Sequence, residues 1–142
     1  MSEYLFNGGF EETVGGDDGI AEGGPFFATD RFGQASSALG LDGIDDRVSA
    51  ARARFAGGDS ISISLWLRVP PNQHSYLTVV SSGQFKVVTF DDDLHGGGQV
   101  GAIFLTTCDQ LRSLCGAFGK MSRGIWHHVL ATYDGVNISI YI

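Results

Sequence analysis

The stretch WHHVLATYDGVNISIYI, residues 126–142, carries the clearest fold signal in the chain, because two apolar-rich runs flank the pair Asp134-Gly135. Such a pair between two such runs is typical of a β-hairpin with a two-residue type I′ turn, since both central residues of that turn need positive φ. This turn would set Tyr133 opposite Val136. Directly opposed residues share a face of the sheet, so one face of the predicted hairpin is apolar and must be buried.

Strict alternation of apolar and polar residues predicts a second strand at ISISLWLR, residues 61–68. Further strands are predicted at YLTVVSS, FKVVTF and QVGAIFLTT, with clusters of glycine, aspartate and asparagine between them. Short strands separated in this way indicate a sandwich or a barrel. We therefore predict an all-β, two-sheet antiparallel sandwich. Its predicted core comprises Ile61, Ile63, Leu65, Leu67, Val129, Ala131, Ile138 and Ile140.

Composition fits this class and excludes several kinds of partner. The 142 residues include 21 glycines, and only 18% are charged, which is low for a helical domain. The net charge of -7, with nine scattered Lys and Arg residues, argues against nucleic acid and anionic lipid as partners. No apolar run approaches the roughly 20 residues that span a bilayer, so we expect no membrane insertion. The N-terminus has no pattern of a signal peptide.

Four stretches, in order, resemble laminin-G-like jelly-roll domains: YLFNGGFEETVGGDDG, TDRFGQASSALGLDGIDDRV, ISISLWLR and GIWHHVLATYDGVNISIYI. The resemblance covers essentially the whole chain and implies the concanavalin A-like jelly-roll sandwich. Arg47 departs from the family pattern, which usually has tyrosine there. Members of the family also continue past the strand that ends at Ile142 with further strands. We therefore expect a single domain over residues 1–142 that is incomplete at its C-terminus.

The resemblance also implies a calcium site, because members of this family often hold one Ca²⁺ near these loops. Ca²⁺ takes six to eight oxygen ligands, which acidic side chains on glycine-rich loops can supply. The candidate ligands are Glu12, Asp42, Asp45 and Asp46, with Asp17 or Asp18 as additions. The alternative is a solvated acidic turn in which aspartates hydrogen-bond their own backbone.

Catalytic signals are weak. His127 and His128 are adjacent and face opposite sides of a strand, so they cannot grip one metal together, and His74 and His95 fall in predicted loops. The acids of FDDD, residues 90–93, alternate between faces and do not form the spaced pair that a glycosidase needs. Cys108 and Cys115 fit a local disulfide or two free thiols equally well.

The expected function is a non-catalytic module for carbohydrate or protein binding, or adhesion, outside the cell or on a cell or virion surface. The alternative is a structural assembly subunit completed by strand donation, with self-association or a partner strand at the edge formed by residues 136–142. A glycan-active enzyme is the third interpretation. Trp66 and Trp126 could stack on sugars, but both match core positions of the family, so we expect them in the core.

Overall fold

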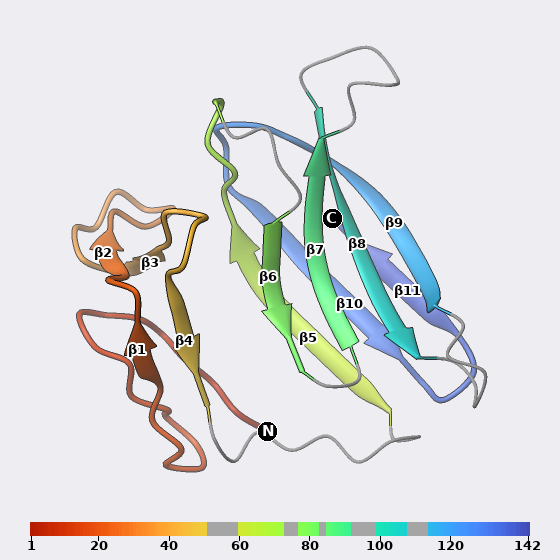
Figure 1. The fold of residues 1–142 in the computed structure, drawn as a ribbon, viewed down its shortest axis with the longest axis horizontal. Coiled ribbons are helices and arrows are strands. Elements are labelled where there is room, and N and C mark those ends of the chain that lie inside the picture. Colours follow the sequence, from red (N-terminus) through yellow and green to blue (C-terminus); the bar gives the residue numbers. More distant parts are fainter. Residues whose placement is uncertain (51–59, 73–76, 83–84, 92–98, 108–113) are drawn as a thin grey trace. The chain divides into compact units, whose positions relative to one another are not determined.

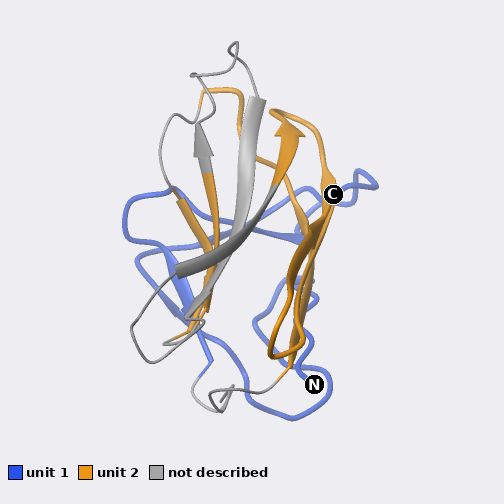
Figure 2. Ribbon diagram, turned by 90° about the vertical axis from the view of Figure 1, so that its right-hand side faces the viewer, with its two compact units in different colours: residues 1–54 blue, residues 55–142 orange. Residues whose placement is uncertain are grey.

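The structure is a computed structural model, and it describes residues 1–50, 60–72, 77–82, 85–91, 99–107 and 114–142. The chain divides into two compact units, residues 1–54 and residues 55–142, which are described separately below (Figures 1 and 2). Every regular element in the described residues is a β-strand, as predicted. None of these residues belongs to a helix long and apolar enough to cross a bilayer.

The first unit consists of turns and four short strands. These are β1 (Ile20–Glu22), β2 (Phe26–Ala28), β3 (Ala38–Gly40) and β4 (Arg47–Ser49). β1 pairs antiparallel with β4, and β2 pairs antiparallel with β3. In the loop that joins β2 to β3, the carboxylate of Asp30 accepts hydrogen bonds from the backbone N–H groups of Phe32 and Gln34. Loops ordered by aspartate side chains explain how so polar and glycine-rich a segment keeps a defined path.

The second unit contains seven strands in two antiparallel sheets. They are β5 (Ile61–Leu67), β6 (Leu77–Ser81), β7 (Phe85–Asp91), β8 (Gln99–Thr107), β9 (Leu114–Ser122), β10 (His127–Tyr133) and β11 (Ile138–Tyr141). One sheet has the order β11-β10-β5 and the other the order β6-β7-β8-β9. The strand predictions at 61–68, 76–82, 85–90 and 99–107 are confirmed.

The core of the second unit lies between these two sheets (Figure 2). In one cluster Ile61 and Ala131, from the first sheet, pack with Phe85 and Val87 of β7. Side chains from both sheets meet in these clusters, so the predicted sandwich is confirmed. All eight predicted core residues are either buried in the clusters or packed against them.

The β10–β11 hairpin has the predicted faces but a different turn. Tyr133 pairs with Ile138 and Ala131 with Ile140, so the strands are joined by the four residues 134–137 and not by two. Gly135 has positive φ, whereas Asp134 does not, which rules out a type I′ turn. The reason is the Asp134 side chain: Oδ1 accepts hydrogen bonds from the backbone N–H groups of Val136 and Asn137, at 2.8 and 2.6 Å.

Strand β9 covers the end of β11. A Cβ atom on Gly119 would lie 2.5 Å from Cδ1 of Ile142, so the Ile142 side chain rests directly on the bare backbone of this glycine. A close approach of this kind needs glycine. The apolar face that the hairpin presents is therefore covered, within the second unit, by the four-stranded sheet.

Candidate functional site

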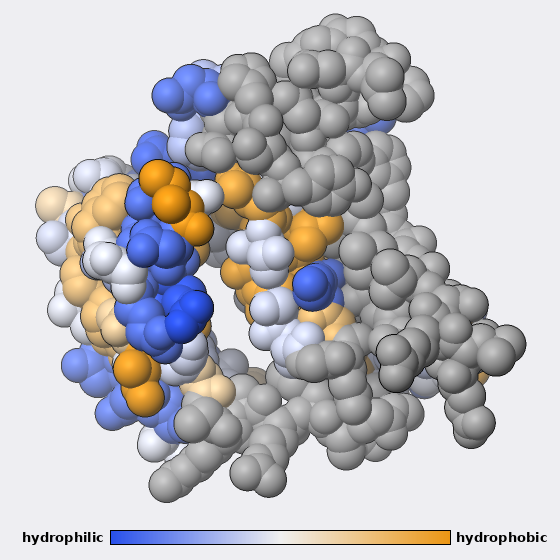
Figure 3. Space-filling model, in the orientation of Figure 1, coloured by the Kyte–Doolittle hydropathy of each residue, from blue (hydrophilic) through white to orange (hydrophobic). Residues whose placement is uncertain are grey.

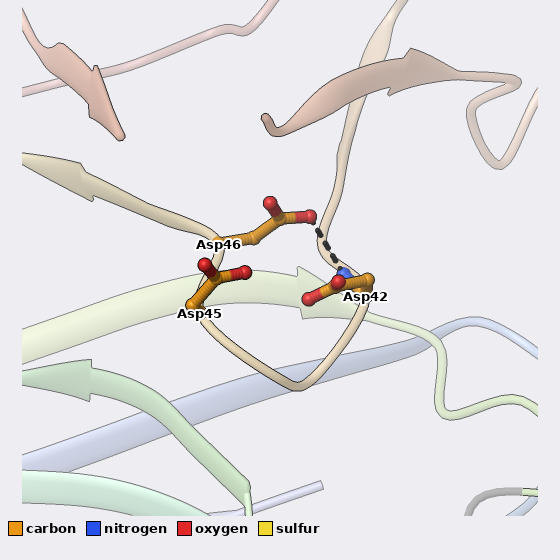
Figure 4. Close-up of side chains that lie close together, drawn as sticks. All are labelled: Asp42, Asp45 and Asp46. Atoms are coloured by element: carbon orange, nitrogen blue, oxygen red, sulfur yellow. Dashed lines mark hydrogen bonds between the residues drawn. The ribbon is translucent and has the colours of Figure 1, made fainter. Parts of the chain in front are cut away.

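Three of the four predicted metal ligands lie together in the loop before β4. Asp42, Asp45 and Asp46 each place one carboxylate oxygen within 4.8 Å of the others (Figure 4). Two oxygens bound to one Ca²⁺ lie at most about 5 Å apart, because each Ca–O bond is about 2.5 Å long. Asp42 and Asp45 are exposed and Asp46 is half-buried. The cluster could therefore hold one metal ion.

Hydrogen bonds within the loop fix two of these carboxylates. Oδ2 of Asp46 accepts a hydrogen bond from the backbone N–H of Asp42 at 2.9 Å, and Oδ1 of Asp42 accepts one from Ile44 at 2.8 Å. Gly43 supplies the positive φ that the turn needs. The turn therefore brings the Asp42 and Asp46 side chains together whether or not an ion is bound.

Strand β1 holds this loop from the side. Gly23 has φ of +90°, and a Cβ there would lie 2.6 Å from the carbonyl oxygen of Asp45, so both conformation and space require glycine. One residue earlier, the carboxylate of Glu22 forms a salt bridge with Arg47, its partner in the β1–β4 register. The hydrogen bond from Glu22, its charge and the charge of Asp45 all raise the pKa of Arg47 above its usual value. The residue that departs from the family pattern thus anchors the acidic loop to β1.

Glu12, the fourth predicted ligand, is not part of the cluster. Its side chain is only 6% exposed, and its carboxylate accepts hydrogen bonds from the backbone N–H groups of Glu3, Gly15 and Gly16. Burial acts to raise the pKa of Glu12, but these N–H groups outweigh it and hold the pKa below its ordinary value. Asp18 in turn accepts a hydrogen bond from the Glu12 N–H at 3.0 Å. Glu12 therefore orders the N-terminal loops of the first unit.

Trp66 differs from its prediction. It lies on the outer face of the three-stranded sheet and is 45% exposed, so its expected place in the core is wrong. Its ring lies 5.2 Å, centroid to centroid, from that of His128, the residue opposite it in the register. Nε2 of His128 is 2.8 Å from the Ser64 hydroxyl. His127 has a structural contact instead: its Nε2 lies 3.1 Å from the Ser122 N–H nitrogen.

Several residues considered for catalysis or redox chemistry lie outside the described residues. They are His74, Asp92, Asp93, His95 and Cys108. Asp91 is the last residue of β7, so the acidic run begins within a strand. The predictions on a disulfide and on the FDDD segment therefore stay predictions.

A comparison with protein families places the chain. The laminin G model described as the concanavalin A-like lectin/glucanases superfamily matches residues 42–142, which is most of the chain. The match begins at the first aspartate of the acidic loop and includes both sheets of the second unit. Comparisons with curated proteins and with solved structures gave no match. The chain belongs to the laminin-G-like family within the concanavalin A-like lectin/glucanases superfamily.

Proposed function

We propose that this chain is a non-catalytic binding or adhesion module that recognises a glycan or a protein outside the cell or at a cell or virion surface. Family membership supports a binding module in general terms. The geometry of the acidic loop supports binding over glycoside hydrolysis. Its carboxylate oxygens lie within 4.8 Å of one another, closer than the roughly 5 to 9.5 Å between the two carboxyl groups of glycosidases.

Calcium binding at Asp42, Asp45 and Asp46 is part of this proposal. A carboxylate cluster of this density repels itself, and a divalent cation would relieve the repulsion while fixing the loop. Ile44, at the tip of the same loop, is 87% exposed. Apolar residues stand singly among hydrophilic ones on the viewed side of this unit (Figure 3). A calcium-ordered loop with an exposed apolar tip would offer a ligand both fixed oxygens and an apolar contact.

The test is binding of the full chain to arrays of glycans and of extracellular proteins, with calcium and with chelator. Asp45→Asn is the sharpest variant, because the hydrogen bonds of the loop run through Asp42 and Asp46. Glu11→Gln, which removes an exposed acid elsewhere in the same unit, is the matched control. We expect calcium-dependent binding that Asp45→Asn weakens and Glu11→Gln leaves unchanged. Absence of binding to either class of ligand would refute the proposed function.

A structural assembly subunit is the second candidate, and the edge of β11 favours it. Among the described strands of the second unit, β11 pairs with β10 alone, and its residues Ile138–Tyr141 carry no charge. Uncharged edge strands are templates for pairing with another chain. Mass measured over a range of concentrations tests this candidate. A mass that grows with concentration, and that Ser139→Pro reduces, would support assembly, and a monomer throughout would exclude self-assembly at this edge.

A further inference from the structure

The outer face of the three-stranded sheet forms an uncharged surface with aromatic side chains. Alternation along β5, β10 and β11 turns eight residues away from the core clusters. They are Ser62, Ser64, Trp66, His128, Leu130, Thr132, Ser139 and Tyr141. We call these eight residues the outer face. None of them is acidic or basic in the usual sense, since histidine is neutral at pH 7, although the chain carries a net charge of -7.

The register fixes how these side chains are arranged. Leu130 lies between Ser64 and Tyr141 in one row across the sheet, and Trp66 faces His128 in the next row. Trp66 is 45% and Tyr141 59% exposed. Two rings therefore stand on opposite edges of the sheet, with an aliphatic side chain between them.

The polar groups of the outer face are held in place. Nε2 of His128 and the Ser64 hydroxyl are 2.8 Å apart, and the His128 ring also packs against Trp66. Hydroxyl and imidazole groups can both donate and accept hydrogen bonds. The one cation beside this surface, Arg68, follows β5, and its guanidinium lies over the ring of Trp126, 5.2 Å from its centroid. The outer face thus combines exposed rings with oriented neutral hydrogen-bonding groups.

The size of the outer face favours a small ligand over a protein. Three strands about 4.8 Å apart and five residues of about 3.4 Å cover roughly 14 by 17 Å, or about 240 Å². A stable protein interface needs about 800 Å² from each partner. Pairing two copies of the chain through this face would also bring together two net charges of -7.

We propose that the outer face binds a neutral oligosaccharide, whose apolar ring faces stack on Trp66 and Tyr141 and whose hydroxyl groups hydrogen-bond to His128 and Ser64. This inference rests on the proposed binding function and names its ligand class. Ligands with sulfate or carboxylate groups are disfavoured, because the outer face offers them no cation and the chain repels them.

Affinity electrophoresis of the full chain tests the inference, in native gels that contain β-glucan, galactomannan, heparin or alginate. We expect retardation by a neutral polysaccharide and not by the two anionic ones. Trp66→Ala and Tyr141→Ala should each weaken it roughly tenfold or more, as truncation of an aromatic anchor does. Trp66→Phe should restore part of the affinity. Val136→Ala changes an exposed residue in the turn, outside the outer face, and should have no effect.

The outcomes separate this inference from the proposed function. Retardation by a neutral polysaccharide that survives both alanine variants would place the site elsewhere and overturn the inference, while the binding function would stand. Retardation by heparin or alginate alone would also overturn it. No retardation by any polysaccharide would overturn the inference as well, and binding on the protein array would then decide the proposed function separately. Melting curves of each variant check that a loss of binding is not a loss of fold.

Discussion

Truncation of Val129 to alanine tests the sandwich most directly. Val129 on β10 is fully buried, in a cluster with Val69 and Met121, so the change removes apolar volume from between the sheets. Two lost methyl groups account for about 1.6 kcal/mol at about 0.8 kcal/mol each. The cavity left behind adds up to about 1 kcal/mol where the neighbours cannot collapse into it. We therefore expect Val129→Ala to lower the free energy of unfolding by about 2 to 2.5 kcal/mol.

Val136→Ala is the matched control, because it makes the same chemical change in the same hairpin at a side chain that is 85% exposed. Its backbone N–H still donates to Asp134, so the turn is kept. Surface changes of this kind stay within about 0.5 kcal/mol. Urea denaturation of both variants and the parent measures the difference at a common slope. A loss under about 0.5 kcal/mol for Val129→Ala, or a larger loss for Val136→Ala, would refute the assignment of the hairpin faces.

Three further perturbations address other parts of the structure. Gly119→Ala should cost about 1 kcal/mol or more by colliding with Ile142, and the cost should vanish in an Ile142→Ala background; additive effects in this double-mutant cycle would contradict the contact. The pKa of Glu12 lies below its ordinary value of 4.5 in the folded chain, so its stabilising contribution is present above that value and is lost as the pH falls through the folded pKa. The stability gap between the parent and Glu12→Gln, followed by urea denaturation at several pH values, should therefore be constant near neutrality and narrow below pH 4.5, and a gap that does not change with pH would show that the charge of Glu12 is irrelevant. Calcium at a hundredfold excess over its dissociation constant should stabilise the fold by roughly 2.7 kcal/mol and raise its melting temperature, an effect that Asp45→Asn should reduce; identical melts in calcium and in chelator would remove the site.

The strands with strict alternation were predictable from the sequence, and strand β9 was not. β5 alternates residue by residue, so its buried face follows directly from period two. The stretch LCGAFGKMS of β9 contains two glycines and no sustained alternation. It is a strand because it pairs with β8 along its whole length and because Gly119 admits Ile142. Both causes are tertiary, and local sequence does not encode them.

The hairpin turn shows why a wrong register can still give the right faces. The predicted pairing set Tyr133 opposite Val136, and the observed partner is Ile138, two residues further on. A shift of two leaves every side chain on its predicted face, whereas a shift of one would have inverted all of them. The pair Asp134-Gly135 was interpreted by its dipeptide alone, while the carboxylate of Asp134 reaches Asn137 and widens the turn.

The acidic loop was predicted in part for a comparable reason. Asp42, Asp45 and Asp46 are neighbours in sequence, so one turn brings them together. Glu12 is distant in sequence, and the resemblance alone assigned it to the same site. Its carboxylate is instead enclosed by the N–H groups of its own loop, and glycines at positions 15 and 16 allow the backbone to approach it. A pattern of EETVGG, an acid followed closely by two glycines, was the available signal for such a turn.

Trp66 is the residue for which two kinds of sequence evidence disagreed. Alternation along ISISLWLR placed it with Ser62 and Ser64, opposite the apolar residues, whereas the resemblance and its large apolar ring favoured the core. Alternation was correct, because the pleat of a strand dictates direction regardless of side-chain size. An aromatic residue that the pleat turns away from the core leaves apolar surface exposed, and an apolar surface in solution is costly unless a ligand or a neighbour covers it. The conflict between the two signals therefore marks Trp66, from sequence alone, as a position where binding is a better explanation than packing.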